Sequence, residues 1–300
     1  MWANQRKRLL IGIFAASGVF LIIVSGNAQA GKKLAVFVSI APQKYFVQQI
    51  GREWVEVQVM VQPGASPATY EPRPRQMAAL SKTPIYFAIG VPFEKNWLEK
   101  ITAVNPNMRV VHTDHGIQKI PMSAHRHAAE KHPGKNHQGE PDPHIWLSPA
   151  LVMIQARTIR DALQEIDPAH RSVYDTHYKA FVSTLADLDA ELRNTFADKQ
   201  GFQFMVFHPS WGYFADTYGL KQVAVEIEGK NPKPAQLKEL IEHAKEKGIK
   251  IIFVQPQFSS KSAKLVAREI GGRVAVADPL AQDWSANLRA VVREFKGALQ

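Results

Sequence analysis

The sequence predicts an α/β fold of two lobes, each a mostly parallel sheet covered by helices, joined by one long rigid linking helix. Short apolar, β-branched runs alternate with amphipathic stretches from residue 33 onward, stop between 116 and 143, and resume after 200. Strands that alternate with helices indicate parallel, helix-covered sheets. We therefore predict an N-terminal lobe at 31–167, the linking helix at 168–199 and a C-terminal lobe at 200–300.

The first 30 residues have the pattern of a secretory signal peptide. Arg6, Lys7 and Arg8 form a basic head, an apolar run follows from Leu9, and Ala28-Gln29-Ala30 provides a small-x-small cleavage site. We expect cleavage near Ala30/Gly31 and a periplasmic product. A retained membrane anchor is the alternative, because the apolar run approaches the length of a membrane-spanning helix.

Composition narrows the class of function. The chain has no cysteine, so no thiolate can bind a metal, and export without disulfides implies a core that is stable alone. Removing the first 30 residues takes away three basic residues, which leaves 34 basic and 27 acidic residues and a formal charge of +7. These basic residues are spread along the chain rather than gathered in a stripe, which argues against nucleic acid as a partner. We expect a monomer.

The N-terminal lobe is predicted to hold four strands and three helices. The strands are the apolar runs 34–40, 55–61, 85–89 and 108–113, and the helices between them cover 42–51, 73–82 and 92–105. Two of these helices open near a proline, which the first helical turn tolerates. From Gly116 to Pro143 the sequence is rich in His, Lys, Pro and Gly and has no periodicity, which predicts a His-rich surface loop.

Two helical stretches lead into the C-terminal lobe. Ser148 is placed as the N-cap, and Pro149 as the first residue, of a helix that extends to 166. The next stretch, 169–198, carries leucines and a phenylalanine on one face, at Phe181, Leu185, Leu188 and Leu192. The lobe itself is predicted to contain strands at 202–207, 221–227, 250–255 and 273–278, with helices at 210–219, 234–248 and 260–272.

Three side chains that can bind metals lie where predicted strands end or a helix begins. His208 directly follows one strand, Asp278 ends another, and His144 lies four residues before an N-cap. Open parallel sheets bind ligands beyond the carboxyl ends of their strands. Each residue alone has an ordinary explanation as a backbone contact or a turn. Together, two imidazoles and a carboxylate fit a divalent transition metal.

Five segments carry a resemblance to a known family. In chain order, GASPATYEPRPRQM, DPHIWLSP, FHPSWGYFADTYGL, EGKNPKPAQLKEL and VADPL resemble the zinc-, manganese- and iron-binding solute-binding proteins of bacterial ABC importers. The resemblance covers nearly the whole chain after the first 30 residues. It implies a non-enzymatic, two-lobed protein that holds a metal between its lobes and delivers it to an ABC membrane permease. A His-rich loop is typical of the zinc-binding branch, so Zn²⁺ is expected before Mn²⁺ or Fe²⁺.

One position departs from the family's pattern. The family's first motif ends its turn with a histidine ligand, but this sequence has Ala68 there. Structural zinc normally takes four protein ligands, so water, Tyr70, Glu71 or a histidine of the loop would complete a sphere begun by the three candidates. The loop histidines in question are His125, His127, His132 and His137.

Alternative interpretations stay open at this point. For Glu71 the plainer explanation is a carboxylate near a helix start, and for the loop histidines it is a solvated tract that gathers or senses zinc. Three ligands and an open position also describe a zinc metalloenzyme, although only Glu71 could serve as its general base. Ala68 could also mark a degenerate binding protein whose ligand has changed.

Overall fold

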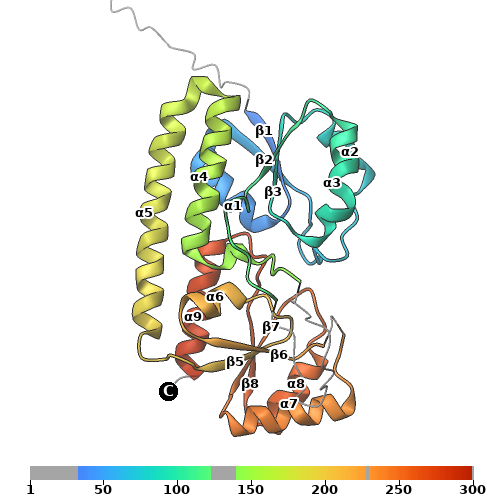
Figure 1. Ribbon diagram of the computed structural model, residues 1–300, viewed down its shortest axis with the longest axis vertical. Helices are drawn as coiled ribbons and strands as arrows, with labels where there is room; N and C mark the ends of the chain where they lie inside the picture. The colour runs from blue at the N-terminus through green and yellow to red at the C-terminus, as the bar shows by residue number, and fades with distance from the viewer. Residues whose placement is uncertain (1–32, 123–139, 228–229, 299–300) are drawn as a thin grey trace, which may run out of the picture. The chain divides into compact units, whose positions relative to one another are not determined.

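A computed structural model describes residues 33–122, 140–227 and 230–298, and these belong to one compact unit that begins at Lys33. The described residues contain two four-stranded sheets, in which all the strand pairs are parallel. Helices connect the successive strands (Figure 1). The predicted α/β fold with two parallel sheets is confirmed.

The first sheet has the strand order β2-β1-β3-β4. Its strands are β1 (Leu34–Val38), β2 (Val55–Val59), β3 (Ile85–Ala88) and β4 (Arg109–His112). The helices between them are α1 (Ala41–Gly51), α2 (Pro74–Leu80) and α3 (Pro92–Val104), and a short 3₁₀ turn (Arg52–Trp54) follows α1. All four residues of β3 are buried, as expected of a central strand covered on both faces. Every strand and helix predicted for this lobe is present, with bounds that differ by at most two residues at either end.

The second sheet repeats this topology with the order β6-β5-β7-β8. Its strands are β5 (Gln203–Val206), β6 (Lys221–Ala224), β7 (Ile251–Val254) and β8 (Arg273–Val276), and its connecting helices are α6 (Gly212–Thr217), α7 (Pro234–Glu246) and α8 (Lys261–Glu269). In both lobes the first strand therefore lies between the second and the third. Loops at the carboxyl ends of β1 and β5 consequently occupy equivalent places in the two lobes.

Several helices begin in the same way at the carboxyl edge of a sheet. A proline stands in the first turn, where its missing N–H is not needed, and a glutamine three residues after the N-cap accepts the N-cap N–H. In α2 the Arg73 N–H donates to Gln76 Oε1 at 2.9 Å, and in α7 the Lys233 N–H donates to Gln236 Oε1 at 2.8 Å. These caps define where each strand-to-helix turn ends, and the turn before α2 carries the candidate Glu71.

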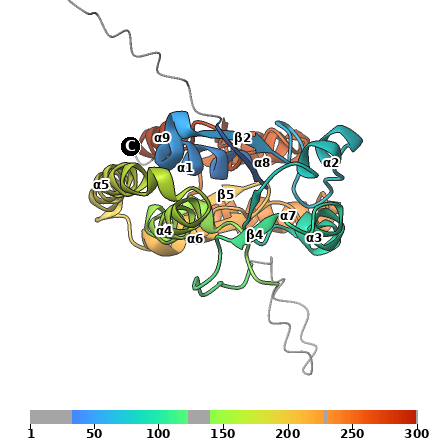
Figure 2. The same ribbon diagram turned by 90° about the horizontal axis from the view of Figure 1, so that it is seen from above.

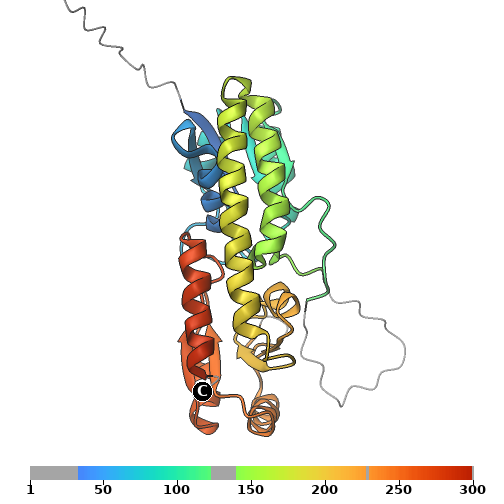
Figure 3. The same cartoon turned by 90° about the vertical axis from the view of Figure 1, so that its left-hand side faces the viewer.

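Two long helices run next to each other, and the second of them connects the lobes (Figures 1 and 3). These are α4 (Pro149–Ile166) and α5 (Arg171–Phe196), which run side by side and are separated by a 3₁₀ turn, Pro168–His170 (Figures 1 and 2). The 26 residues of α5 extend over about 39 Å at 1.5 Å per residue. The four residues predicted to share one face are all at least 97% buried: Phe181, Leu185, Leu188 and Leu192. The predicted long linking helix is therefore present.

A helix that was not predicted, α9 (Trp284–Ala298), also connects the two lobes. The Trp284 ring packs edge-to-face on Phe46 of α1 at 5.3 Å, while Phe295 lies 4.6 Å from Phe253 of β7. Trp284 Nε1 donates to the carbonyl of Trp146 at 2.7 Å, and Trp146 Nε1 donates to the carbonyl of Pro279 at 2.7 Å. Seen from the side in Figure 3, α9 lies next to α5. Buried aromatic contacts of this kind hold the two lobes in one arrangement.

Candidate metal site

His144 is held in a buried turn directly before the 3₁₀ turn Ile145–Leu147. It is 8% exposed, and its Nδ1–H donates to Asp142 Oδ1 at 2.7 Å. The same Asp142 oxygen accepts the backbone N–H of His144 at 2.9 Å, so the turn and the ring orientation are set together. Burial lowers the pKa of His144 below its usual value, and the nearby Asp142 carboxylate only partly offsets that effect. The imidazole is therefore neutral at neutral pH, which is the form that binds metals.

His208 follows β5 at the carboxyl edge of the second sheet. Its Nδ1–H donates to Glu226 Oε1 at 2.7 Å, and Glu226 is 5% exposed. Gln255, after β7, holds the His208 backbone from both sides, because its Oε1 accepts the His208 N–H at 3.1 Å and its Nε2 donates to the His208 carbonyl at 2.7 Å. The ring also stacks on Phe258 at 5.0 Å. These contacts leave the His208 side chain 22% exposed.

The structure brings the two imidazoles together. Their ring centroids are 5.3 Å apart, and the ring planes meet at 70°. In both rings a buried carboxylate accepts from Nδ1, so Nε2 is the nitrogen left to bind a metal. The pair of sequence-predicted histidines, separated by 63 intervening residues in the chain, is thus a pair in space.

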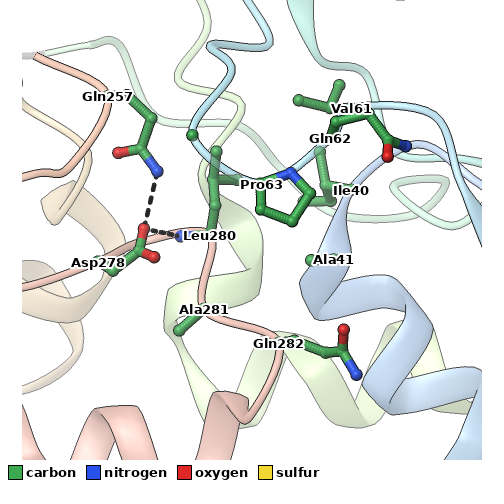
Figure 4. A pocket seen from close by; sticks show the side chains of 11 residues that line it. Ile40, Ala41, Val61, Gln62, Pro63, Gln257, Asp278, Leu280, Ala281 and Gln282 are labelled. Atoms are coloured by element: carbon green, nitrogen blue, oxygen red, sulfur yellow. Dashed lines mark hydrogen bonds between the residues drawn. The ribbon is translucent and has the colours of Figure 1, made fainter.

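Asp278 lies in a loop after β8 and lines a cavity of about 140 Å³ (Figure 4). Both hydrogen bonds to its side chain are accepted by Oδ1, from Gln257 Nε2 at 2.9 Å and from the Leu280 N–H at 3.0 Å. The other walls of the cavity come from the turns after β1 and β2 of the first sheet. Asp278 therefore faces the boundary between the lobes, as predicted for a ligand between them.

The candidate ligands do not form a complete metal site in the described residues. Throughout 33–122, 140–227 and 230–298, no three His, Asp or Glu side chains lie close enough together to hold one metal ion. Ala68 and Glu71 are exposed in the β2–α2 turn. The four loop histidines lie outside the described residues. The set of His144, His208 and Asp278 accordingly stays a prediction, of which only the histidine pair is seen to be in contact.

Sequence reasoning missed the residues that hold the ligands. Asp142, Glu226, Gln255 and Gln257 bind no metal in our prediction, yet each contacts a predicted ligand. Asp142 stands two residues before His144, and the other three lie at the ends of β6 and β7. The strand-end rule that selected His208 applies to Glu226, Gln255 and Gln257 as well.

Comparison with known proteins gives a family match over most of the chain. The family described as "Zinc-uptake complex component A periplasmic" (ZnuA) matches residues 36–298. The chain belongs to this family. It is accordingly an exported solute-binding component rather than an enzyme, and within the described ranges no helix has the length and apolarity to cross a bilayer.

The individual relatives include a zinc uptake protein and a zinc-binding lipoprotein. The chain is 28% identical over 281 residues to the high-affinity zinc uptake system protein ZnuA of Bacillus subtilis, covering 90% of this chain and 88% of that protein. It is 25% identical to the zinc-binding lipoprotein AdcA of Streptococcus pneumoniae, covering 91% of this chain but only 55% of AdcA. A crystal structure of ZnuA has 42% identity and a TM-score of 0.82, and the match covers 90% of this chain and all of that chain.

Proposed function

We propose that this chain captures Zn²⁺ between its two lobes and hands it to the membrane permease of an ABC importer. The observation that supports this most directly is the contact between His144 and His208, each with Nδ1 hydrogen-bonded to a buried carboxylate. Metal-binding histidines have this arrangement, because the carboxylate holds the tautomer in which Nε2 is free. Membership in a family of zinc-uptake components supports the same function.

Asp278 is proposed as the third ligand. Its Oδ2 accepts neither of the two hydrogen bonds described above, and the adjacent cavity gives its side chain room to move. The fourth position, where the family has histidine and this chain has Ala68, is proposed to be taken by water, with Glu71 or a loop histidine as alternatives. Deleting residues 123–138 tests whether a loop histidine is the fourth ligand, because unchanged zinc affinity and stoichiometry would exclude it.

Zinc is favoured over manganese by the donor atoms. Two imidazole nitrogens suit Zn²⁺, whereas hard cations prefer sites made wholly of oxygen. The carboxylate of Asp278 leaves Mn²⁺ and Fe²⁺ as weaker candidates. The metalloenzyme alternative is not favoured, because the named relatives are zinc-uptake and zinc-binding proteins. We further propose that residues 1–30 are removed near Ala30/Gly31 and that the product acts as a monomer without nucleic acid.

The test is calorimetric titration of the chain that begins at Gly31. We expect one tight Zn²⁺ site, which His144→Ala and His208→Ala each weaken by about 100-fold or more, equivalent to ~3 kcal/mol. The exposed His115→Ala is the matched control and should bind like the wild type. Asp278→Ala, compared with the exposed Asp187→Ala, tests the third ligand. Wild-type affinity in His208→Ala would exclude the proposed site.

A further inference from the structure

We propose that Asp142 and Glu226 are positioning residues of the metal site: they orient the two imidazoles and place negative charge behind them. This inference rests on the proposed function of His144 and His208. Two neutral imidazoles bring no charge to a divalent ion. The carboxylates of Asp142 and Glu226 place negative charge directly behind the two rings, in addition to the charge of Asp278.

Both carboxylates are buried and are hydrogen-bonded mainly to the histidine beside them. Asp142 is 0% exposed, and its Oδ1 accepts both the backbone N–H and the ring Nδ1–H of His144. Glu226 is 5% exposed, and its Oε1 accepts from His208 Nδ1. Among the described residues neither Asp142 Oδ2 nor Glu226 Oε2 has a hydrogen-bond partner. A buried, half-satisfied carboxylate is unfavourable for stability alone, which points to a role in binding.

Asp142 is held from the lobe that carries the other histidine. Tyr213 of α6 donates its hydroxyl hydrogen to the Asp142 carbonyl at 2.9 Å, and the same hydroxyl accepts the Ile120 N–H at 3.1 Å. The neighbouring Gly212 leaves the space that Asp142 occupies, since a Cβ at Gly212 would lie 2.5 Å from Asp142 Oδ2. The C-terminal lobe therefore contacts the residue that orients His144 as well as carrying His208 and Glu226.

Glu226 reaches His208 through the parallel sheet. The Glu226 N–H donates to the Phe207 carbonyl at 3.1 Å, directly beyond the paired residues of β6 and β5. Adjacent parallel strands end at the same edge of a sheet, so the residues that follow them lie side by side. His208 and Glu226 therefore meet because β5 and β6 are neighbours.

A second aspartate–histidine pair in the chain provides a matched control. Asp167 Oδ2 accepts from His170 Nδ1 at 2.8 Å, which closely resembles the 2.7 Å contact between Asp142 and His144. The same Asp167 oxygen also accepts the Tyr174 hydroxyl at 2.6 Å, and His170 stacks on Trp54 at 3.8 Å. Removing the charge of Asp167 tests the effect of an Asp–His pair that lies outside the proposed site.

The experiment compares Asp142→Asn, Glu226→Gln and Asp167→Asn with the wild type in Zn²⁺ titrations. The two amides keep an acceptor oxygen but lose the charge, and we expect each to lower zinc affinity by about 10- to 100-fold. Asp167→Asn should bind zinc like the wild type. Thermal unfolding without metal establishes that the variants are folded.

A second readout addresses orientation without any metal. Nitrogen-15 NMR of the metal-free wild type should show His144 and His208 protonated at Nδ1. Asp142→Ala should shift the His144 ring toward the Nε2-protonated form, and Asp142→Asn should restore the wild-type tautomer. Gly212→Ala keeps all the polar groups but displaces Asp142, so it should lower zinc affinity even if Asp142→Ala does not fold.

The outcomes separate this inference from the proposed function. Wild-type zinc affinity in both Asp142→Asn and Glu226→Gln, with His144→Ala and His208→Ala still defective, would overturn the positioning role alone. Wild-type affinity in the two histidine variants would overturn both. Loss of affinity in Asp142→Asn and Glu226→Gln, with Asp167→Asn unaffected, supports the inference.

Discussion

The carboxyl edges of the two sheets have the same topology but use their polar residues differently. Each lobe places its first strand between the second and the third, and each edge contains a buried glutamate, Glu94 in one lobe and Glu226 in the other. The first edge satisfies its glutamate with groups from its own lobe. The second leaves a glutamate oxygen and the Nε2 of His208 available, and His144 of the first lobe lies beside the same ring.

At the first edge, Glu94 is enclosed by donors. It accepts the backbone N–H of Gly90 at 2.7 Å, the N–H of Ile89 at 3.0 Å, and the hydroxyl of Ser39. Ser39 is also hydrogen-bonded to the Tyr86 hydroxyl at 2.7 Å. A carboxylate surrounded in this way stabilises the turn between β3 and α3 and has no capacity left for a ligand.

At the second edge, the protein supplies too few hydrogen-bond donors for its carboxylates. Glu226 has one oxygen bonded to His208 and one without a partner among the described residues, and Asp278 accepts both of its described hydrogen bonds on one oxygen. The same topology thus places polar residues at both edges. Only an edge whose polar atoms are not all hydrogen-bonded within the protein can bind a metal ion. The predictions below test this difference, beginning with the largest effect.

Zinc should stabilise the protein through the second edge and His144, and not through Glu94 of the first edge. A ligand that binds only the folded state, at a free concentration of roughly 1,000 times its Kd, raises the free energy of unfolding by about 4 kcal/mol. We expect this increase for the wild type in chemical unfolding with and without Zn²⁺, and again after Glu94→Gln. His208→Ala should show almost none. Equal stabilisation of His208→Ala would contradict the assignment of the open edge.

Removing the carboxylate of the closed edge should affect folding and not zinc. Glu94→Ala leaves the buried N–H groups of Ile89 and Gly90 without their acceptor and opens a cavity, which we expect to cost about 3 kcal/mol of unfolding free energy. Zinc affinity of the folded variant should change less than about twofold. Glu94→Gln is the control, because its amide oxygen still accepts, and it should cost about 1 kcal/mol. A loss of zinc affinity in Glu94→Gln would show that the first edge takes part in binding.

Local sequence patterns predicted most of the fold. Alternation of apolar runs and amphipathic stretches located both sheets, because parallel strands buried on both faces are apolar throughout. The missed helix α9 had a readable signal, since Leu288, Val291, Val292 and Phe295 have helical spacing and are at least 98% buried. Its contact with α1 through Trp284 could not be predicted, since packing between distant segments leaves no local periodicity.

The candidate site was predicted in part. A strand end selected His208 and a helix entrance selected His144, and in the structure the two rings lie 5.3 Å apart. These two signals could not tell a ligand from its support, because Asp142 stands at the same helix entrance as His144 and Glu226 also follows a strand, and they differ only in what they contact. Whether a carboxylate is satisfied depends on donors from distant strands, as for Glu94, and a single sequence does not show these.

Replacing glycine by alanine should show how little space the first edge leaves around Gly90. Gly90 has φ +87, and a Cβ there would lie 2.7 Å from Asp114 Oδ2 and against the Lys119 ammonium. Gly116 has a similar φ of +81 but no atom within 4 Å of the corresponding position. We expect Gly90→Ala to cost about 2 kcal/mol and Gly116→Ala about 1 kcal/mol, because only the first adds a clash to the backbone strain. Equal losses of unfolding free energy in the two variants, measured in urea, would show that Asp114 and Lys119 do not clash with the added methyl group.

The closed edge should also give a pH dependence of stability that arises from Glu94. Burial raises the pKa of Glu94, with a further small contribution from Asp114, and this outweighs the hydrogen bonds from Ser39, Ile89 and Gly90 that favour the carboxylate. In the window above the ordinary glutamate pKa of about 4.5, the folded state therefore holds a proton that the unfolded state has released.

Stability must then fall as pH rises through that window and level off above the folded-state pKa of Glu94. One proton limits the slope to about 1.4 kcal/mol per pH unit. Other groups titrate in the same range, so the measurement is the difference in unfolding free energy between wild type and Glu94→Gln, recorded in urea from pH 4 upward in zinc-free buffer. We expect the wild type to lose stability relative to Glu94→Gln with increasing pH. A difference that is flat, or that rises with pH, would mean that donors at the first edge hold Glu94 ionised throughout.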